Sequence, residues 1–541
     1  MGDFHQKMLS ESTQHHVQLH PDHVPTGHGH ALVKTVGNHT LHLKASQIPS
    51  TNVHRNANIW RYPATGDLST MISGGGQATI PIIRGTGSGH ASELFLRLVI
   101  TNNTGSDVRL VDMCHLIDNI EFQTPSGQQI QQLNSDELWL NLVRFYDDEQ
   151  WKKIAKMINS NPRYGKGEVQ PNSTIRTYYL PLIGNWIQNC GFFLPVIDGD
   201  IQCLVQFKPA SATVVSGSAP TLTGLSLDVR MEQLHGGERV GRLQNYRRMP
   251  HHYYIAFPKR QQFSQAITAG TTYELNLSGI RGDVMWIDFF IRATESGDGY
   301  RKFAPISSFS LLNNEGDEIS GQQDITSDFN RFILQSEYYP SSYSYDYPVY
   351  SYVFGADDHG PMSFIYHGER HGSYPFTTHE RLRFTAGPAG TSEVQTATLS
   401  AGLVAADGGS WQIEWVTPNG SEYTEPFAYN ESTANIKAAI ESLSTFDGTI
   451  TVSDALTATA TPVNFTFGGN YAYMPMAARG YKLIVHSIDV NDGGVPGGAV
   501  MSVSTPGVEG FNTGGTHTIT VIAWTSALLK QDKGNLEVRY T

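Results

Sequence analysis

The chain has 541 residues, only 16% of them charged, and a formal net charge of −13 at neutral pH. By length it can hold roughly three or four domains, and its negative charge argues against a nucleic-acid binder. No apolar run approaches the roughly 20 residues that cross a bilayer, and the first ten residues lack the layout of a secretory signal. Abundant Gly, Thr, Ser, Asn and Tyr favour an all-β protein with long ordered loops, which we expect to be made and folded as a soluble protein.

The three cysteines are too few for a disulfide framework and lack the paired spacing of zinc ligands. They are Cys114, Cys190 and Cys203. Since Cys203 lies inside a predicted strand, we expect it to be a buried free thiol.

Residues 1–58 carry ten of the 21 histidines and little hydrophobic periodicity, which is typical of an extended arm. Histidine-rich tracts can bind metal, and His28-Gly29-His30 is similar to the metal-binding pair of a cupin. The cupin pattern fails because no glutamate follows before Glu93, so we assign no metal site. The formal charge of the arm is close to zero, so it is not a polybasic DNA tether.

Residues 59–245 form the first predicted unit, in which short strands follow one another with turn signals between them. The last strand, LSLDVRMEQL, alternates Leu227, Val229 and Met231 with charged residues. This is the two-residue period of a half-buried antiparallel strand. Eight or so strands with helices confined to loops favour a β-sandwich over an α/β fold.

One stretch of the chain occurs twice. Residues 117–130 (IDNIEFQTPSGQQI) and 306–319 (ISSFSLLNNEGDEI) each predict a strand that runs into a glycine turn and is followed by a helix. The helix starts are marked by capping residues, Asn134 with Glu137 three residues on, and Thr326. These starts lie 192 residues apart, a domain-sized period that predicts a duplicated β domain.

Both repeated helices carry apolar residues at helical spacing, which predicts one buried face on each. The residues are Leu138, Trp139, Leu142 and Val143 in the first helix, and Phe329, Phe332 and Ile333 in the second.

Residues 246–390 together with 511–541 form the second predicted unit, which contains a tyrosine-dense loop. Tyrosine combines apolar area with a polar tip, so this loop suits a protein interface or a receptor contact. Ordinary packing over the rim of the sandwich is equally compatible with it. The tyrosines are Tyr338, Tyr339, Tyr343, Tyr345, Tyr347, Tyr350 and Tyr352.

Residues 391–510 interrupt the second unit and carry −9 of the formal charge, from twelve acidic and three basic residues. The segment resembles a small domain of tailed-phage and other virion proteins in four places: EVQTATLS, GGSWQIEWV, NESTANIKAAIESL and VNFTFGG. The resemblance implies a self-contained domain, and its acidity suits a surface exposed to water.

Both halves together resemble the double jelly-roll major capsid proteins of icosahedral double-stranded DNA viruses with an internal membrane. IEFQTPSGQQI followed by DELWLNLV is similar to that family's strand, glycine turn and tryptophan-containing helix. The segments around Tyr179-Leu180-Pro181-Leu182 and Gly372-Ser373, and the closing ALLKQDKGNLEVRYT, are similar to later family motifs in the family's order. The long arm and the inserted virion-type domain are departures, and the latter points to a virus of bacteria.

The resemblance implies an all-β chain of two consecutive eight-stranded jelly rolls with short loop helices and an inserted tower domain of α+β or Ig-like type. It implies a homotrimer whose six rolls make a nearly hexagonal capsomer of the virion shell, made in the host cytoplasm. Implied partners are further copies of the chain, penton and minor capsid proteins, and the internal membrane near the arm. We expect no direct sequence-specific binding of nucleic acid.

The alternative interpretation is a virion spike or another receptor- or glycan-binding β-sandwich protein that uses the tyrosine loop. Enzymatic interpretations fit poorly. HGERH at 367–371 is flanked by glycine and unsuited to a metalloprotease helix, and GTGSG at 85–89 lacks the lysine of a phosphate-binding loop. We therefore expect no catalytic residue, no cofactor and no metal site.

Overall fold

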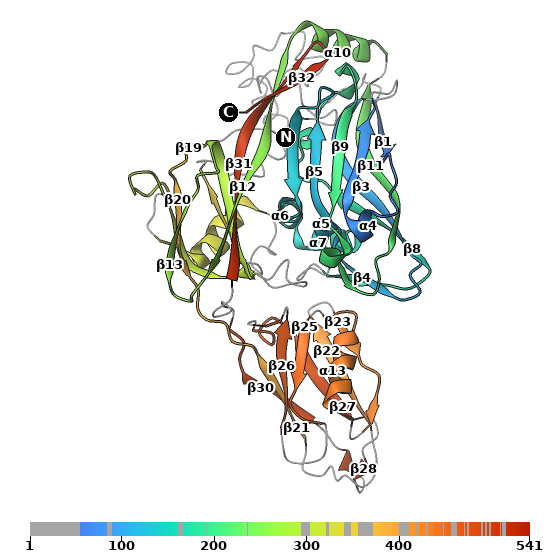
Figure 1. Ribbon diagram of the computed structural model, residues 1–541, viewed down its shortest axis with the longest axis vertical. Coiled ribbons are helices and arrows are strands. Elements are labelled where there is room, and N and C mark those ends of the chain that lie inside the picture. Colours follow the sequence, from blue (N-terminus) through green and yellow to red (C-terminus); the bar gives the residue numbers. More distant parts are fainter. Residues whose placement is uncertain are drawn as a thin grey trace, which may run out of the picture.

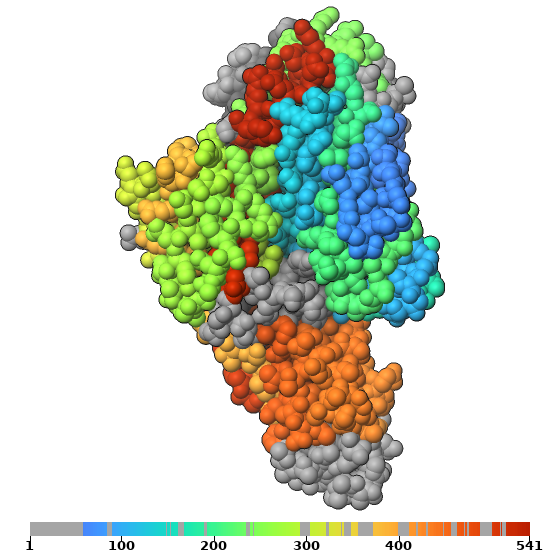
Figure 2. Space-filling model, in the orientation of Figure 1, coloured from blue at the N-terminus to red at the C-terminus, as the bar shows by residue number. Residues whose placement is uncertain are grey.

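In the computed structural model, two β-sandwiches lie side by side and a smaller domain projects from one end of the pair (Figures 1 and 2). The structure describes residues 55–540 except 84–88, 161–165, 191, 235, 294–302, 321–323, 340–347, 355–371, 400–409, 418–419, 429–430, 447, 456–461, 470, 473–474, 488–490, 493–494, 497–498, 509 and 511–515.

The first sandwich, called the first roll below, consists of two four-stranded antiparallel sheets. One sheet runs in the order β1 (Arg55–Pro63), β11 (Thr221–Leu234), β3 (His90–Asn102), β8 (Thr174–Pro181). The other runs β2 (Gly76–Ile82), β9 (Ile201–Phe207), β5 (Ile117–Gln123), β6 (Gln129–Asn134). Alternate residues of these strands are buried between the sheets, as the two-residue period of β3 and β9 predicts.

The second roll has the same plan. Its first sheet runs β12 (His251–Ala266), β31 (Thr516–Asp532), β14 (Gly282–Ala293), and β18 (Val349–Val353) pairs with β14. Its second sheet runs β13 (Thr272–Asn276), β20 (Arg381–Ala386), β16 (Ile306–Leu312), β17 (Ile325–Thr326).

The two rolls share one strand order. When the eight sandwich strands of each roll are counted along the chain, one sheet has the order 1-8-3-6 and the other 2-7-4-5 in both rolls. This is the jelly-roll arrangement, and it confirms the predicted all-β double jelly roll. The repeated sequence occupies strands 4 and 5 and the helix after them, with Gly127 and Gly316 at positive φ (84° and 89°) in the turns.

The helices after strand 5 differ in regularity. In the first roll, α6 (Ser135–Phe145) begins with the predicted capping box, in which the Glu137 carboxylate accepts a hydrogen bond from the Asn134 backbone N–H at 2.6 Å. The helix α7 (Asp148–Met157) follows it. In the second roll, the Thr326 hydroxyl accepts from the Phe329 backbone N–H, and the chain continues as the π-helical segment η4 (Phe329–Leu334) and α11 (Gln335–Tyr338).

The inserted domain lies between strands 7 and 8 of the second roll, and it has its own core. Two sheets, β25-β26-β21-β30 and β23-β22-β24 with β27, pack with the helix α13 (Thr433–Ser442) around Trp415, whose ring lies 5.1 Å from that of Phe446 and 5.6 Å from that of Tyr481. The strands are β21 (Val394–Leu399), β22 (Ser410–Thr417), β23 (Gly420–Tyr423), β24 (Phe427–Ala428), β25 (Gly448–Val452), β26 (Val463–Gly469), β27 (Lys482–Ser487) and β30 (Ala499–Thr505).

Although the insertion is part of the second roll in sequence, it docks on the first roll. Arg109 in β4 (Val108–Val111) donates to the backbone carbonyl of Ser444 at 2.9 Å and to that of Phe446 at 3.4 Å. Its Nε also donates to the carbonyl of Gly167 at 2.8 Å, and only 7% of the residue is exposed. One arginine therefore connects the insertion to two strands of the first roll, β4 and the strand at Lys166–Gln170.

Two long strands join the rolls. β12 and β31 pair over 16 residues, and their far halves leave the second roll and contribute Tyr253 and Leu529 to the core of the first. The strand β32 (Asn535–Tyr540) pairs with β31 and reaches the first roll's glycine turn, where Gln128 exchanges two hydrogen bonds with the backbone of Val538 at 2.7 and 3.0 Å. The strand β32 therefore contacts the first roll, although it follows the second roll in the sequence.

The remaining described elements are short, apart from the 13-residue helix α10. They are α4 (Met71–Gly74), α5 (Met113–Leu116), β7 (Lys166–Gln170), α8 (Trp186–Cys190), η3 (Leu194–Val196), α9 (Ala210–Thr213), β10 (Val214–Ser216), α10 (Gly236–Arg248), β15 (Phe303–Ala304), β19 (Tyr374–Phe376), β28 (Asn491–Asp492) and β29 (Val495–Pro496). In the part of the chain that the structure describes, no helix is both long and apolar enough to cross a membrane.

Other expectations from the sequence have different outcomes in the structure. Cys203 is a buried free thiol, as predicted. The strand β12, the first of the second roll, was not predicted from the sequence. The predicted burial of the second repeated helix is wrong, because Phe329, Phe332 and Ile333 are 40%, 48% and 48% exposed. HGERH lies outside the described residues.

The separate core of the insertion leads to a first prediction. Residues 391–510 expressed alone should unfold in one cooperative transition, and Trp415→Ala should lower the free energy of unfolding by about 3–5 kcal/mol because it empties the centre of that core. Chemical denaturation followed by fluorescence checks both points. A non-cooperative transition of the wild-type fragment would contradict domain independence.

Candidate functional site

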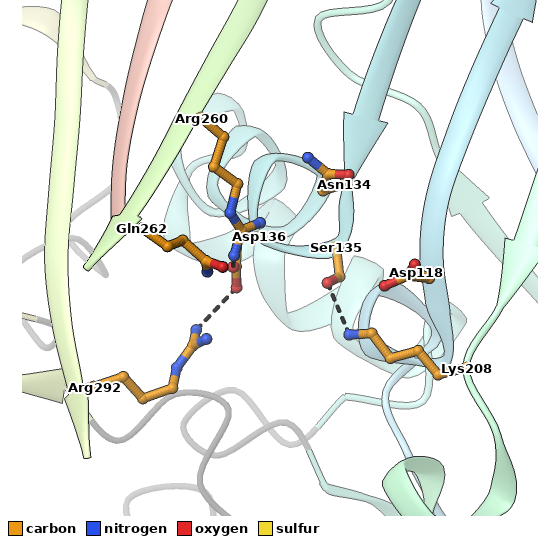
Figure 3. A pocket seen from close by; sticks show the side chains of 8 residues that line it. All are labelled: Asp118, Asn134, Ser135, Asp136, Lys208, Arg260, Gln262 and Arg292. Carbon is orange, nitrogen blue, oxygen red and sulfur yellow. Dashed lines mark hydrogen bonds and ion pairs between the residues drawn. The ribbon is translucent and has the colours of Figure 1, made fainter. Parts of the chain in front are cut away.

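A polar pocket of about 300 Å³ lies at the junction of the two rolls (Figure 3). Side chains from both rolls line it. They are Asp118, Asn134, Ser135, Asp136, Lys208, Arg260, Gln262 and Arg292.

Asp136 occupies the centre of this cluster. It lies in the first turn of α6, where the helix dipole favours a carboxylate. Its two oxygens accept from Arg260 of β12 at 2.7 Å and from Arg292 of β14 at 2.9 Å. One side chain of the first roll is therefore held by two strands of the second (Figure 3).

The electrostatics favour the charged aspartate. Burial alone would raise the pKa of Asp136, but the positive charges of Arg292 and Arg260 outweigh it and hold this pKa well below its usual range. The neighbouring Glu137 is also buried, and there burial dominates and raises the pKa of its carboxyl. Asp136 is therefore the anion that neutralises the two arginines.

Two bases, Lys208 in the pocket and His115 beside it, have a pKa that burial shifts. Burial lowers the pKa of Lys208 to about 8, and its Nζ donates to the Ser135 hydroxyl at 2.9 Å. Burial also lowers the pKa of His115, whose Nδ1 lies 2.9 Å from Asp112. His115 is therefore neutral at physiological pH.

A second ion pair fixes the other end of the same helix. Arg144, near the C-terminus of α6, lies 2.8 Å from Asp288 of β14, and Trp524 of β31 donates to the same carboxylate at 2.9 Å. The Arg144 guanidinium also lies 4.5 Å from the centre of the Tyr339 ring. Both ends of α6 are therefore bound to the second roll.

This arrangement is suited to holding two domains together rather than to catalysis. Each cation that lines the pocket already faces a carboxylate or a hydroxyl, and these contacts set the relative orientation of the rolls. Among the described residues, no group of three His, Cys, Asp or Glu side chains could hold a metal ion.

The structure places the predicted tyrosines in different surroundings. Tyr339 and Tyr350 are 5% and 0% exposed, so these two side chains pack inside the chain and are not available to a receptor. The Tyr350 hydroxyl accepts from the backbone N–H of Ile306. Tyr338 and Tyr352 are half-buried, whereas Tyr343, Tyr345 and Tyr347 lie outside the described residues. The interface role stays a prediction for those five.

The charge cluster around Asp136 was not predicted, although the sequence contains one signal for it. The pair Ser135-Asp136 recurs 192 residues later as Ser327-Asp328, just inside the second helix. A repeated acid at a helix start marks a position to examine. Arg260 could not be found in this way, because the strand that carries it was not predicted.

Comparisons with known proteins identify the fold. No protein-family model and no curated protein matches the chain. A solved structure described as the PBCV-1 virus capsid aligns with 90% of this chain and 98% of its own, with a TM-score of 0.50 and 13% identity. PBCV-1 VP54 fitted into a reconstruction of the virophage Sputnik gives 0.51 and 12% over the same shares. The double jelly-roll architecture implied by the resemblance is thus confirmed.

The two repeated aspartates provide a matched pair of substitutions. Asp136→Asn should destabilise the chain by about 3–5 kcal/mol, because it leaves two buried arginines without their anion. Asp328→Asn should change stability by less than about 0.5 kcal/mol, since Asp328 is exposed and makes no ion pair within the described residues. Urea denaturation of the isolated chain measures both, and equal effects would show that Asp136 does not join the rolls.

The low pKa of Asp136 also predicts a pH dependence. A carboxyl whose pKa is lower in the folded than in the unfolded state stabilises the fold above the unfolded value of 3.8, and this contribution is lost as pH falls. Between pH 5 and pH 3 the wild type should therefore lose about 1 kcal/mol more stability than Asp136→Asn. Parallel denaturation curves at the two pH values test this, and identical losses would contradict it.

Proposed function

We propose that this chain is a major capsid protein whose homotrimer forms a pseudo-hexagonal capsomer in the icosahedral shell of a double-stranded DNA virus. The observation that carries the proposal is the repetition of one jelly-roll strand order twice in a single chain. A threefold ring of such chains presents six similar domains, so it can occupy a sixfold position in a lattice. The fold likeness to the PBCV-1 capsid structures supports the same function.

The inserted domain suits the outer surface of such a shell. It projects from one end of the paired rolls (Figures 1 and 2) and holds most of the chain's excess negative charge. An acidic domain of this kind stays in water and would form a tower on each capsomer. Its resemblance to virion domains of tailed phages supports a bacterial host.

The remaining partners follow from the same proposal. Further copies of the chain would build the lattice, with penton and minor capsid proteins filling the positions that the trimer cannot. The histidine-rich arm would lie at the base of the capsomer, close to an internal membrane.

The proposal predicts the behaviour of the purified full chain. Sedimentation velocity should give three times the chain mass of 59.6 kDa, and negative-stain images should show a nearly hexagonal outline. In purified virions the chain should be the most abundant protein band. A monomer at all concentrations, or a scarce virion protein, would contradict the capsomer and favour a spike.

The arm provides a separate test of the membrane contact. Its ten histidines become positively charged as pH falls below about 6.5, the unperturbed value, and a cationic arm binds anionic lipid. The full chain should therefore sediment with phosphatidylserine liposomes more at pH 5.5 than at pH 7.5, while a chain lacking residues 1–54 should not. Equal binding in all four samples would discard the contact.

A further inference from the structure

The second repeated helix begins with a turn of unusual register. Residues Phe329–Leu334 form the π-helical segment η4, in which the backbone N–H of Gln335 donates to the carbonyl of Asn330, five residues earlier. Short π-helical turns are rare and occur frequently at functional sites. The corresponding helix of the first roll, α6, is a regular α-helix. The register of η4 therefore needs a specific cause.

A pair of buried amide side chains explains the π register. The Gln335 Nε2 donates to the Asn330 Oδ1 at 3.0 Å and to the backbone carbonyl of Val349 at 2.7 Å. In an α-helix, residues five positions apart point roughly 140° apart around the axis, so their side chains do not meet. A π turn, which closes between such residues, brings the two side chains together. The contact between Asn330 and Gln335 therefore selects the π turn.

The strand β18 holds this amide pair in place. The Asn330 Nδ2 donates to the carbonyl of Ser351 at 2.6 Å, and the Ser351 backbone N–H donates to the Asn330 Oδ1 at 3.2 Å. Asn330 and Gln335 are 0% and 1% exposed, so these hydrogen bonds form in a region of low dielectric constant, where an amide group that loses its partner is costly. The π turn therefore depends on the position of Ser351.

Ser351 also reaches the junction between the rolls. It pairs with Asp288 across β18 and β14, and its hydroxyl donates to the Asp288 carboxylate at 2.6 Å. Arg144, from α6 of the first roll, donates to the same hydroxyl and lies 2.8 Å from the same carboxylate. An unbroken path of buried hydrogen bonds therefore runs from the first roll through Ser351 to Asn330 in η4.

The far end of the helical segment depends on the same arginine. Tyr339 follows α11, which continues η4 without a break. Its ring lies 4.5 Å from the Arg144 guanidinium, close enough for a cation–π contact, and the residue is 5% exposed. Arg144 therefore supports the start of the segment through Ser351 and its end through Tyr339.

We propose that docking of the first roll keeps the π turn of the second roll closed. Arg144 enters from the first roll and fixes Ser351 and Tyr339, which hold the two ends of the segment 329–338. When Arg144 is withdrawn, the amide pair loses its support and the turn opens. The fold thus contains a conformational device in which the junction controls a helix of the second roll.

The device also affects the surface of the second roll. The side chains of Phe329 and Ile333 are exposed on the same segment, so their placement follows the state of the turn. A chain with docked rolls therefore presents this apolar surface in a fixed form, whereas a chain with separated rolls does not. The inference does not rest on the proposed trimer, because every contact that it uses lies within one chain.

The other end of α6 provides a matched control. Arg292 also joins the rolls through an ion pair with α6, at 2.9 Å from Asp136, but its described hydrogen bond does not lead to η4. Arg292→Met weakens the junction and leaves the path through Ser351 intact. A general loosening of the junction would affect Arg144→Met and Arg292→Met alike, whereas the proposed path affects only the former.

Hydrogen exchange of the full chain, followed by mass spectrometry of peptides from residues 331–338, measures the opening of the turn. Arg144→Met and Ser351→Ala should each exchange about 10-fold faster than the wild type there, because each removes a hydrogen bond that involves a charged group. Arg292→Met should stay within about twofold of the wild type. Peptides from β9, in the core of the first roll, show whether each variant is folded.

Wild-type exchange at residues 331–338 in folded Arg144→Met or Ser351→Ala overturns the inference, because the second roll would then hold the turn by itself. Equal acceleration in Arg292→Met overturns it as well, since the junction as a whole would then control the turn. If Arg144→Met does not fold, Ser351→Ala decides, because it removes a single hydroxyl and keeps the ion pair with Asp288.

Discussion

The relative placement of the two rolls depends on a buried aspartate held between two arginines. Asp136 belongs to a helix of the first roll, whereas Arg260 and Arg292 belong to the strands β12 and β14 of one sheet of the second roll. Buried ion pairs add little net stability compared with apolar packing, but they strongly penalise arrangements that separate the partners. The apolar core shared by the rolls supplies the free energy, for example through Trp139 against Phe303 at 5.6 Å. The ion pairs select one orientation for that core.

The duplicated helix occurs in two different environments. Inside the chain, its first copy is buried from Ser135 to Arg144 and makes a permanent contact between domains. In the second copy, apolar side chains stand where the first has Glu137, Leu140 and Asn141, and they are exposed. The two copies thus diverged in chemistry while the strand order of the rolls stayed the same.

Much of the fold could be predicted from the sequence. Strands with a strict two-residue hydrophobic period, such as β9 and β11, could be predicted, because the signal is local. The capping box at Asn134 could be predicted for the same reason. β12 was not, because half of it covers the first roll while the other half carries polar residues such as Lys259 and Gln261. The first roll buries part of β12, and the local hydrophobic pattern of the strand does not show this.

The functional surfaces were less predictable for the same reason. Helical spacing identified Phe329, Phe332 and Ile333 as one apolar face, but spacing alone cannot tell a buried face from an exposed one. Tyrosine density likewise identified a loop, but the structure buries Tyr339 against Arg144 and Tyr350 within the second roll. In both cases the residue type indicated an apolar surface, but the residues that pack against it could not be predicted, because they lie far away in the sequence.

The contact between Gln128 and the strand at residues 535–540 has a consequence for synthesis on the ribosome. The two sides of that contact are 410 residues apart, so the first sandwich leaves the ribosome long before its backbone partner at Val538 is synthesised. Until then, the glycine turn and the edge beside it lack their cover. A polypeptide that stops before residue 535 therefore lacks the backbone partner of the Gln128 side chain.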